Sequence, residues 1–168
     1  MRSQILLILL AIVFFSCGSS RKTVSSKKSN EIEYNVPADI TPKVKAIIEN
    51  AKEYEGVRYK YGGDNKKGID CSGLVMNAYD KENIKLPRST SQLASSGDWV
   101  DLKQVRPGDL MFFATRKNSR KVNHVAIVTE ARPGYIEFIH STTSRGVITS
   151  TLDEKYWYFA FVQARRVL

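Results

Sequence analysis

Apolar residues lie at helical spacing in the first part of the globular sequence. Between positions 41 and 56 they share one helical face, at Val44, Ile47, Ile48 and Ala51. Thr41 followed by Pro42 is typical of a helix start, because a threonine side chain caps free N–H groups and proline is tolerated at the first helical position. Gly56 is typical of a helix end. The pattern predicts a helix up to about Gly56, then a loop or short strand over 57–63.

A second apolar helical face begins near Cys71. Its members are Leu74, Val75, Ala78 and Tyr79. The residues at 81–87, which finish with a proline, end this helix. A short third helix is expected over 90–96, where Gly97 stops it.

The sequence after residue 107 is typical of strands. β-Branched and aromatic residues dominate five segments, 110–114, 122–130, 135–140, 147–149 and 159–167. The clearest turn signals are Pro107-Gly108-Asp109 and Arg132-Pro133-Gly134. Helices followed by an antiparallel meander predict an α+β fold, in which N-terminal helices pack on an antiparallel sheet.

The two histidines of the chain lie in two strands of one predicted hairpin. If the turn centres on Arg132, His124 is directly opposite His140. The same folding pairs Ala126 with Phe138 and Val128 with Ile136. Directly opposed residues point to one face of a sheet, so the histidines are expected to be neighbours. A one-residue slip in register would separate them.

The N-terminus is typical of an export signal. Residues 5–15 form an apolar run of eleven residues, shorter than the roughly 20 that a membrane-spanning helix needs. The run ends at Ser16 and Cys17, which resembles a bacterial lipobox. We therefore expect a lipoprotein signal peptide over 1–16 and a lipid anchor at Cys17. Ordinary secretion with a free Cys17 is the alternative.

The segment 17–40 is predicted to join this anchor to the domain as a flexible tether. Its first part is rich in serine and lysine and poor in apolar residues. Gly18, rather than an aspartate, follows the anchor cysteine. This favours a lipid-anchored protein of the cell envelope, in the outer membrane and facing the periplasm.

Charge and composition narrow the function classes. The 168 residues are 42% hydrophobic and 26% charged, which suits one globular domain, 41–168, with a short extension. Residues 1–30 carry five basic residues and no acid, so the remainder has a net charge of 21 − 17 = +4 out of the total of +9. This mild charge argues against nucleic-acid binding. Two cysteines are too few for a disulfide scaffold.

Cys71 is a candidate nucleophile. It is expected at a helix start, after a glycine-rich loop, and helix N-termini lower a cysteine pKa from about 8.5 into the range of roughly 3.5–7.5. If Cys17 is acylated, Cys71 is the only thiol left in the chain. The structural alternative is a small buried hydrophobic residue.

The histidine pair suits a general base and a residue that orients it. A zinc site made by Cys71, His124 and His140 with an open water position is the other interpretation. No two of these residues lie at a short metal-binding spacing. We therefore expect neither a metal nor another cofactor.

Five segments together resemble the NlpC-type family of papain-like bacterial cell-wall cysteine peptidases. They are 59–63 (Tyr-Lys-Tyr-Gly-Gly), 68–75 (Gly-Ile-Asp-Cys-Ser-Gly-Leu-Val), 86–88 (Leu-Pro-Arg), 107–113 (Pro-Gly-Asp-Leu-Met-Phe-Phe) and 123–128 (Asn-His-Val-Ala-Ile-Val). The resemblance covers the whole of 41–168. It implies a compact papain-like α+β domain.

The resemblance also implies roles for individual residues. Cys71 is expected to be the nucleophile, His124 the general base and His140 the third polar residue that orients the imidazole. Tyr59 would lie beside the oxyanion, although it could also simply pack in the core. The residues expected to contact the stem peptide are Asp70, Ser72, Arg88 and Thr90. Thr90 replaces the usual serine, and Asp70 could also serve only as a helix cap.

The expected function is that of a cysteine endopeptidase acting on peptidoglycan stem peptides. The scissile bond would be either D-γ-glutamyl–diamino acid or D-alanyl–diamino acid. Two alternatives stay open. One is a catalytically silent wall-binding adaptor, and the other is an amidase or acyltransferase on the same fold. The expected partners are stem peptides and, through Cys17, the membrane, with the protein otherwise a monomer.

Overall fold

The computed structural model describes residues 40–168. The predicted signal peptide, the lipid anchor at Cys17 and the tether up to position 39 lie outside the described residues. Within 40–168, none of the helices is both long and apolar enough to cross a bilayer.

Three capped helices form the first part of the domain. They are α1 (Pro42–Lys52), α2 (Cys71–Asp80) and α3 (Thr90–Leu93). Each helix follows a residue whose side chain accepts a hydrogen bond from a backbone N–H of its first turn. These capping residues are Thr41, Asp70 and Ser89, respectively. Helix α1 ends four residues before Gly56, which adopts φ +77° in the turn that follows.

A six-stranded antiparallel sheet forms the second part. Its strands are β3 (Asp98–Val100), β4 (Leu110–Phe113), β5 (His124–Arg132), β6 (Tyr135–Thr142), β7 (Gly146–Thr151) and β8 (Phe161–Arg166). Their order in the sheet is β3-β8-β4-β5-β6-β7. The five predicted strands are all present, and the fold is the α+β arrangement that the pattern predicts.

Five further elements were not predicted. They are the two-stranded β1 (Asp64–Asn65) and β2 (Gly68–Ile69), strand β3, the 3-10 helix η1 (Leu102–Gln104) and helix α4 (Lys155–Ala160). The expected strand 159–167 therefore starts too early, because Phe159 and Ala160 belong to helix α4. Its aromatic sequence resembles a strand, but only Trp157 and Ala160 of the helix are buried.

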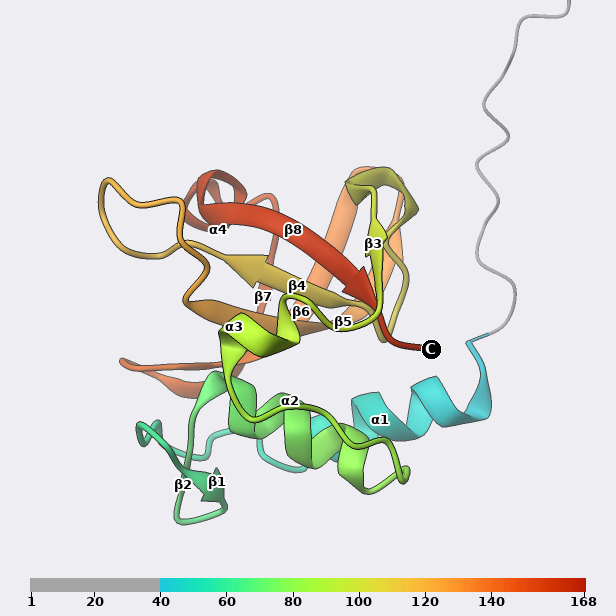
Figure 1. The fold of residues 1–168 in the computed structure, drawn as a ribbon, viewed down its shortest axis with the longest axis vertical. Helices are drawn as coiled ribbons and strands as arrows, with labels where there is room; N and C mark the ends of the chain where they lie inside the picture. Colours follow the sequence, from blue (N-terminus) through green and yellow to red (C-terminus); the bar gives the residue numbers. More distant parts are fainter. Residues whose placement is uncertain (1–39) are drawn as a thin grey trace, which may run out of the picture. The chain divides into compact units, whose positions relative to one another are not determined.

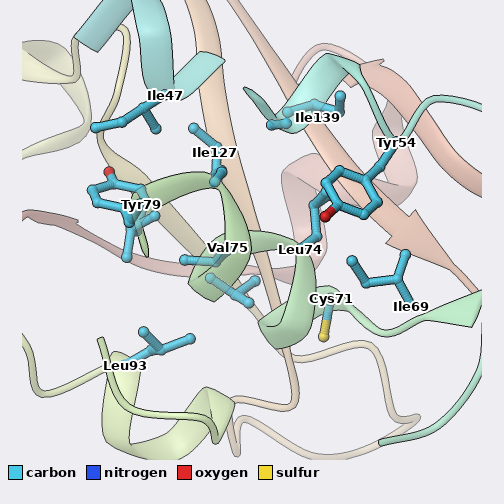
Figure 2. Packing of buried hydrophobic residues seen from close by; sticks show 14 of the residues in the cluster. Ile47, Tyr54, Ile69, Cys71, Leu74, Val75, Tyr79, Leu93, Ile127 and Ile139 are labelled. Carbon is cyan, nitrogen blue, oxygen red and sulfur yellow. The ribbon is translucent and has the colours of Figure 1, made fainter. Parts of the chain in front are cut away.

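The sheet buries both of its faces. Figure 1 shows α1 and α2 along one side of it, and Figure 2 shows their apolar side chains packed with Ile127 and Ile139. On the other face, Phe113 and Phe138 pack with Trp157 of α4. Successive residues along a strand point to opposite faces, so β5 and β6 supply side chains to both clusters.

The hairpin of β5 and β6 has a different register from the predicted one. Val128 pairs with Phe138, and Ile136 pairs with Ala131. The turn lies at Pro133 and Gly134, one to two residues later than predicted, and an irregularity at Thr129 adds one residue to β5. Continuing this register places Ala126, rather than His124, opposite His140. The slip is two residues, so both histidines remain on one face.

Candidate active site

Cys71 is the first residue of α2, at the end of the glycine-rich loop. A side chain at Gly73 would collide with the carbonyl oxygen of Gly63, so the helix can approach the loop closely only with glycine there. The hydroxyl of Ser141 on β6 donates to the carbonyl of Ile69 over 2.8 Å. The segment that leads into Cys71 is thus fixed both to the loop and to the sheet.

The Asp70 carboxylate holds this helix start together. Its Oδ1 accepts from the N–H of Gly73 at 2.7 Å, and its Oδ2 accepts from the N–H of Gly62 at 2.8 Å. Arg88 donates to both carboxylate oxygens, at 2.8 and 3.0 Å. Burial works to raise the pKa of Asp70, but the hydrogen bonds from Arg88 and the two N–H groups outweigh it and hold the pKa below its usual value.

Ser72 and Arg88 belong to the same network. The Ser72 hydroxyl donates to Asp70 at 3.1 Å and accepts from Arg88 at 2.8 Å. Arg88 also donates to the Gly63 carbonyl at 2.9 Å. The structure therefore brings three of the four predicted stem-peptide contacts together, where they bond to one another and cap α2.

The Cys71 thiol lies at the margin of the apolar core. Figure 2 shows its sulfur pointing away from the labelled apolar side chains, and 7% of the residue is exposed. The expected lowering of its pKa is not found: burial raises the pKa of the thiol, although hydrogen bonds to Thr90 and to the backbone of Val125 and Ser72 act in the opposite direction. The sulfur lies 3.7 Å from the Thr90 hydroxyl.

His124 and His140 form a hydrogen-bonded pair. His124 Nε2 lies 2.8 Å from His140 Nδ1. The pairing is diagonal across β5 and β6, yet the two rings reach one another, with centroids 5.1 Å apart. The expected neighbourhood of the histidines is present, although their expected direct opposition is wrong.

Ser150 on β7 extends this pair into a chain. Its hydroxyl lies 3.1 Å from His140 Nε2. If His124 is to take a proton at Nδ1, its Nε2–H must donate to His140 Nδ1, and the Nε2–H of His140 must then donate to Ser150. Within residues 40–168, His124 Nδ1 has no hydrogen-bond partner, so this nitrogen is free to accept a proton from a group other than His140 and Ser150.

Aromatic side chains enclose both imidazoles. Trp157 stacks on His124 at 25° and meets His140 edge-on, with ring centroids 5.5 and 4.6 Å away. Phe138 and Phe113 lie against the pair from the sheet. Burial lowers the pKa of His124 to about 4 and, aided by His124 and Arg145, that of His140 to about 3. Both imidazoles are therefore neutral at pH 7.

One cavity joins the thiol to the imidazole. It measures about 450 Å³, and its walls include Tyr59, Cys71, His124 and Trp157. Tyr59 is half-buried, and its hydroxyl has no hydrogen-bond partner in the described part of the chain. Burial, followed by the nearby Cys71 and Asp70, raises its pKa, so the hydroxyl is a donor at neutral pH. A thiol, a neutral base and a free hydroxyl thus line one cavity. These are the groups that acyl transfer to a nucleophile requires.

Comparison with known proteins identifies this arrangement. The profile of the NlpC/P60 family matches residues 56–166. The chain belongs to the NlpC/P60 family. It is 38% identical over 125 residues to the "Probable endopeptidase NlpC" of Escherichia coli, covering 74% of this chain and 78% of that protein.

Two more NlpC/P60 proteins are similar. The E. coli "Murein DD-endopeptidase MepS/Murein LD-carboxypeptidase" is 40% identical over 123 residues, which are 73% of this chain and 62% of that protein. A crystal structure of an NlpC/P60 family protein from Bacillus cereus superposes with a TM-score of 0.68 at 28% identity, covering 79% of this chain and 41% of the other. The chain thus spans less than half the length of that solved protein.

Within this NlpC/P60 domain, the structure separates the predicted site residues into two groups. Tyr59, Cys71 and His124 line the cavity, and His140 supports His124 from behind. Asp70, Ser72 and Arg88 form the network around the start of α2, beside the cavity rather than on its wall. Thr90 touches the Cys71 sulfur. Asp70 does cap α2, and its contact with the stem peptide stays a prediction.

Sequence reasoning missed two residues of the NlpC/P60 site. Ser150 has no distinguishing pattern, because alternation only places it on a strand. Trp157 contacts both imidazoles from α4, a helix that the sequence pattern did not predict.

The zinc interpretation finds no support in the geometry. Within residues 40–168, no three histidine, cysteine or acidic side chains converge as a metal ion would require. Cys71 and the histidine pair instead meet across the cavity wall.

Proposed function

We propose that this chain is a cysteine endopeptidase that hydrolyses an amide bond in peptidoglycan stem peptides. The observation that carries the proposal is the cavity that Cys71 shares with a hydrogen-bonded His124–His140–Ser150 chain. The names of its relatives, an endopeptidase and a murein DD-endopeptidase, support the same substrate class.

The first step transfers a proton and forms a covalent bond. Nδ1 of His124 takes the thiol proton as the Cys71 sulfur attacks the amide carbonyl carbon. The negative charge moves to the carbonyl oxygen. The backbone N–H of Cys71, which has no partner within α2 because it lies in the first turn, and the Tyr59 hydroxyl would stabilise that oxyanion.

The second step expels the amine. The tetrahedral intermediate collapses as His124 returns its proton to the leaving nitrogen, and the acyl half of the substrate remains on Cys71 as a thioester. His124, neutral again, then takes a proton from water, whose oxygen attacks the thioester. Collapse releases a carboxylic acid and restores the thiol.

His140 and Ser150 would act through His124. When His124 is protonated, its Nε2–H donates to the neutral His140 Nδ1, and the Nε2–H of His140 donates to the Ser150 hydroxyl. This chain keeps His124 in the tautomer with a free lone pair on Nδ1. His140 and Ser150 are therefore positioning residues.

The raised pKa of Cys71 and the lowered pKa of His124 favour a neutral resting pair. In this respect the site differs from one that stores a thiolate. We infer that the thiolate forms during attack, when the proton passes to His124.

The wall-binding adaptor and the amidase or acyltransferase remain outcomes of the test. No feature of the described residues favours either over the peptidase. Both predict intact stem peptides after incubation.

We also propose that Cys17 carries a lipid anchor that holds a monomeric enzyme at the outer membrane, facing the periplasm. The support is the apolar run 5–15 and the small residue before Cys17. Mass spectrometry of the mature N-terminus tests this: an acylated Cys17 is expected, and a free amine without acyl mass contradicts it. Fractionation of the envelope then separates outer from inner membrane.

The test of the activity compares the full chain, in detergent, with Cys71→Ser. Each is incubated with intact peptidoglycan and with defined muropeptides, and products are identified by mass spectrometry. New stem fragments from the wild type alone are expected. Conversion of dimers to monomers identifies the D-alanyl–diamino acid bond, and loss of the diamino acid from the D-glutamate of a single stem identifies the D-γ-glutamyl bond. No product from fully reduced wild type contradicts the proposal.

A further inference from the structure

A second hollow adjoins the active-site cavity. It measures about 370 Å³ and lies between the segment 114–117 and helix α4. Thr115 and Tyr156 line both spaces, so the two are adjacent. We call this second space the cationic hollow, because its walls include Arg116, Lys117 and Lys155, together with Phe159.

The charges on this hollow are not neutralised within the domain. Residues 40–168 offer no carboxylate to Arg116, Lys117 or Lys155, which take part in none of the salt bridges. On the walls of the two spaces together, these three and Arg145 are opposed by one carboxylate, Glu154. One oxygen of Glu154 already accepts the N–H of Thr151 at 3.0 Å. An anion entering here would meet a net positive field.

The hollow also offers apolar surface. Tyr156 is 59% exposed and Phe159 is 73% exposed. Aromatic faces that are this open on a six-residue helix contribute little to the core. Hydrocarbon chains pack well on such faces, while a charged group at the end of the chain reaches the cations.

The walls of the hollow are held to one another. Asn123, next to His124, accepts the N–H of Thr115 at 2.7 Å and donates to its hydroxyl at 2.8 Å. Arg120 donates to the carbonyls of Phe159 and Phe161, at 3.3 and 3.0 Å. Figure 1 shows the loop between β4 and β5 extending on the same side of the sheet as α4. The hollow is therefore fixed relative to His124.

The chemistry of the reaction decides which part of the substrate lies there. His124 must reach the leaving nitrogen to protonate it. The substrate half that carries this nitrogen therefore extends on the His124 side of the scissile bond. The loop behind Asn123 leads from His124 directly into the cationic hollow. The acyl half extends instead towards the start of α2.

The leaving nitrogen belongs to the diamino acid in both candidate bonds. We propose that the cationic hollow binds a free carboxylate of this diamino acid, while its hydrocarbon chain packs on Tyr156 and Phe159. This inference rests on the proposed function and adds a specificity to it. A diamino acid with a free carboxylate on the leaving side is preferred over its carboxamide and over one that lacks the group.

The test measures binding and turnover separately. In the Cys71→Ala background, the dissociation constants of two peptides are measured by NMR titration. The peptides differ only in a carboxylate or a carboxamide on the diamino acid. The hollow is neutralised by Arg116→Gln, Lys117→Gln and Lys155→Gln together. The matched control removes the same charge elsewhere, by Lys43→Gln, Lys45→Gln and Lys121→Gln, all exposed and outside both spaces.

Neutralising the hollow is expected to weaken binding of the carboxylate peptide about tenfold, as roughly three exposed ion pairs would. The carboxamide peptide and the control variant should change less than about twofold. With active enzyme, the same variant should raise KM for the carboxylate substrate and leave kcat nearly unchanged. Phe159→Ser should weaken binding of both peptides.

Two failures are distinguishable. Equal loss of both peptides, or equal loss in the control variant, would overturn the inference while leaving the peptidase intact. Selective binding that depends on the hollow, without any cleavage by the wild type, would overturn the proposed function and leave the carboxylate site in place.

Discussion

The two sides of the catalytic cavity keep polar groups inside the protein in opposite ways. At the start of α2, the Asp70 carboxylate stays charged because Arg88 and two backbone N–H groups neutralise it. On the sheet, His124 and His140 stay neutral because aromatic rings exclude water from them. The α2 side thus neutralises a buried charge with hydrogen bonds and an ion pair, and the sheet side keeps its imidazoles uncharged.

The difference explains why Asp70 and His124 have different roles in the site. Every oxygen of Asp70 is occupied, so the carboxylate can hold the backbone of Cys71 but has no remaining capacity to move protons. His124 has one occupied nitrogen and one free nitrogen, so it can move a proton without moving itself. The charged Asp70 network therefore positions Cys71, and the neutral imidazole of His124 transfers protons.

The largest effect is expected from removing the reactive groups. Cys71→Ser and His124→Ala should each lower kcat by roughly 10⁴-fold or more, measured as release of stem fragments. Neither change breaks the Asp70 network, so the thermal midpoint should fall by only a few degrees. A variant that loses activity only because it unfolds would contradict this separation.

The neutral side predicts a loss of stability in mild acid. Unfolded histidine binds a proton near pH 6.5, whereas His124 and His140 do so at about 4 and about 3 in the fold. Below pH 6.5 the unfolded chain gains protons that the folded chain does not, so the free energy of unfolding falls as the pH falls. From pH 7 to pH 5 the loss is about 2 kcal/mol per histidine.

Urea unfolding at the two pH values measures this loss. His140→Asn should remove about half of it. Asp70 does not contribute in this range, because its lowered pKa keeps it ionised in the fold and it loses stability only at lower pH. A pH-independent free energy of unfolding between pH 7 and 5 would mean that the imidazoles are not buried neutral.

The charged side predicts a smaller loss from a single substitution. Asp70→Ala removes the α2 cap and leaves Arg88 without its carboxylate, which should cost about 2–3 kcal/mol, since Arg88 is partly exposed. Asp80→Ala is the control, because its partner Lys85 is largely exposed and the pair contributes less than about 1 kcal/mol. Equal costs in chemical denaturation would show that the network is not what fixes α2.

The smallest effect is expected at Ser150. Ser150→Ala leaves the Nε2–H of His140 without an acceptor, and kcat should fall about tenfold with KM unchanged, as for one lost hydrogen bond. Because protonated His124 is then less well supported, the acid limb of the pH–rate profile should move to lower pH. Ser150→Thr, which keeps the hydroxyl, should restore the profile. A loss of activity without that movement would indicate a packing role alone.

The sequence predicts most of the fold because its signals are local. Thr41, Asp70 and Ser89 cap helices where their neighbours begin an apolar helical face, and turn residues bound the strands. The hairpin register was wrong because an extra residue at Thr129 and the position of a two-residue turn have no local signature. The histidine neighbourhood was still correct, because a shift by two residues returns each side chain to the same face.

The site was only partly predictable for a related reason. Cys71 and His124 belong to recognisable segments, whereas Ser150 and Trp157 reach the imidazoles through contacts that are distant in sequence. The pKa of Cys71 was predicted in the wrong direction, because its position at a helix start is local information and its burial is not.

The role of Cys71 is tested in a single series of samples. Reduced full chain is alkylated for increasing times, and each sample is assayed twice: for the fraction of Cys71 modified, by peptide mass spectrometry, and for turnover of a defined muropeptide. Activity should fall in proportion to the modified fraction and reach zero when Cys71 is fully alkylated. Turnover that persists with Cys71 fully modified would contradict a thiol mechanism.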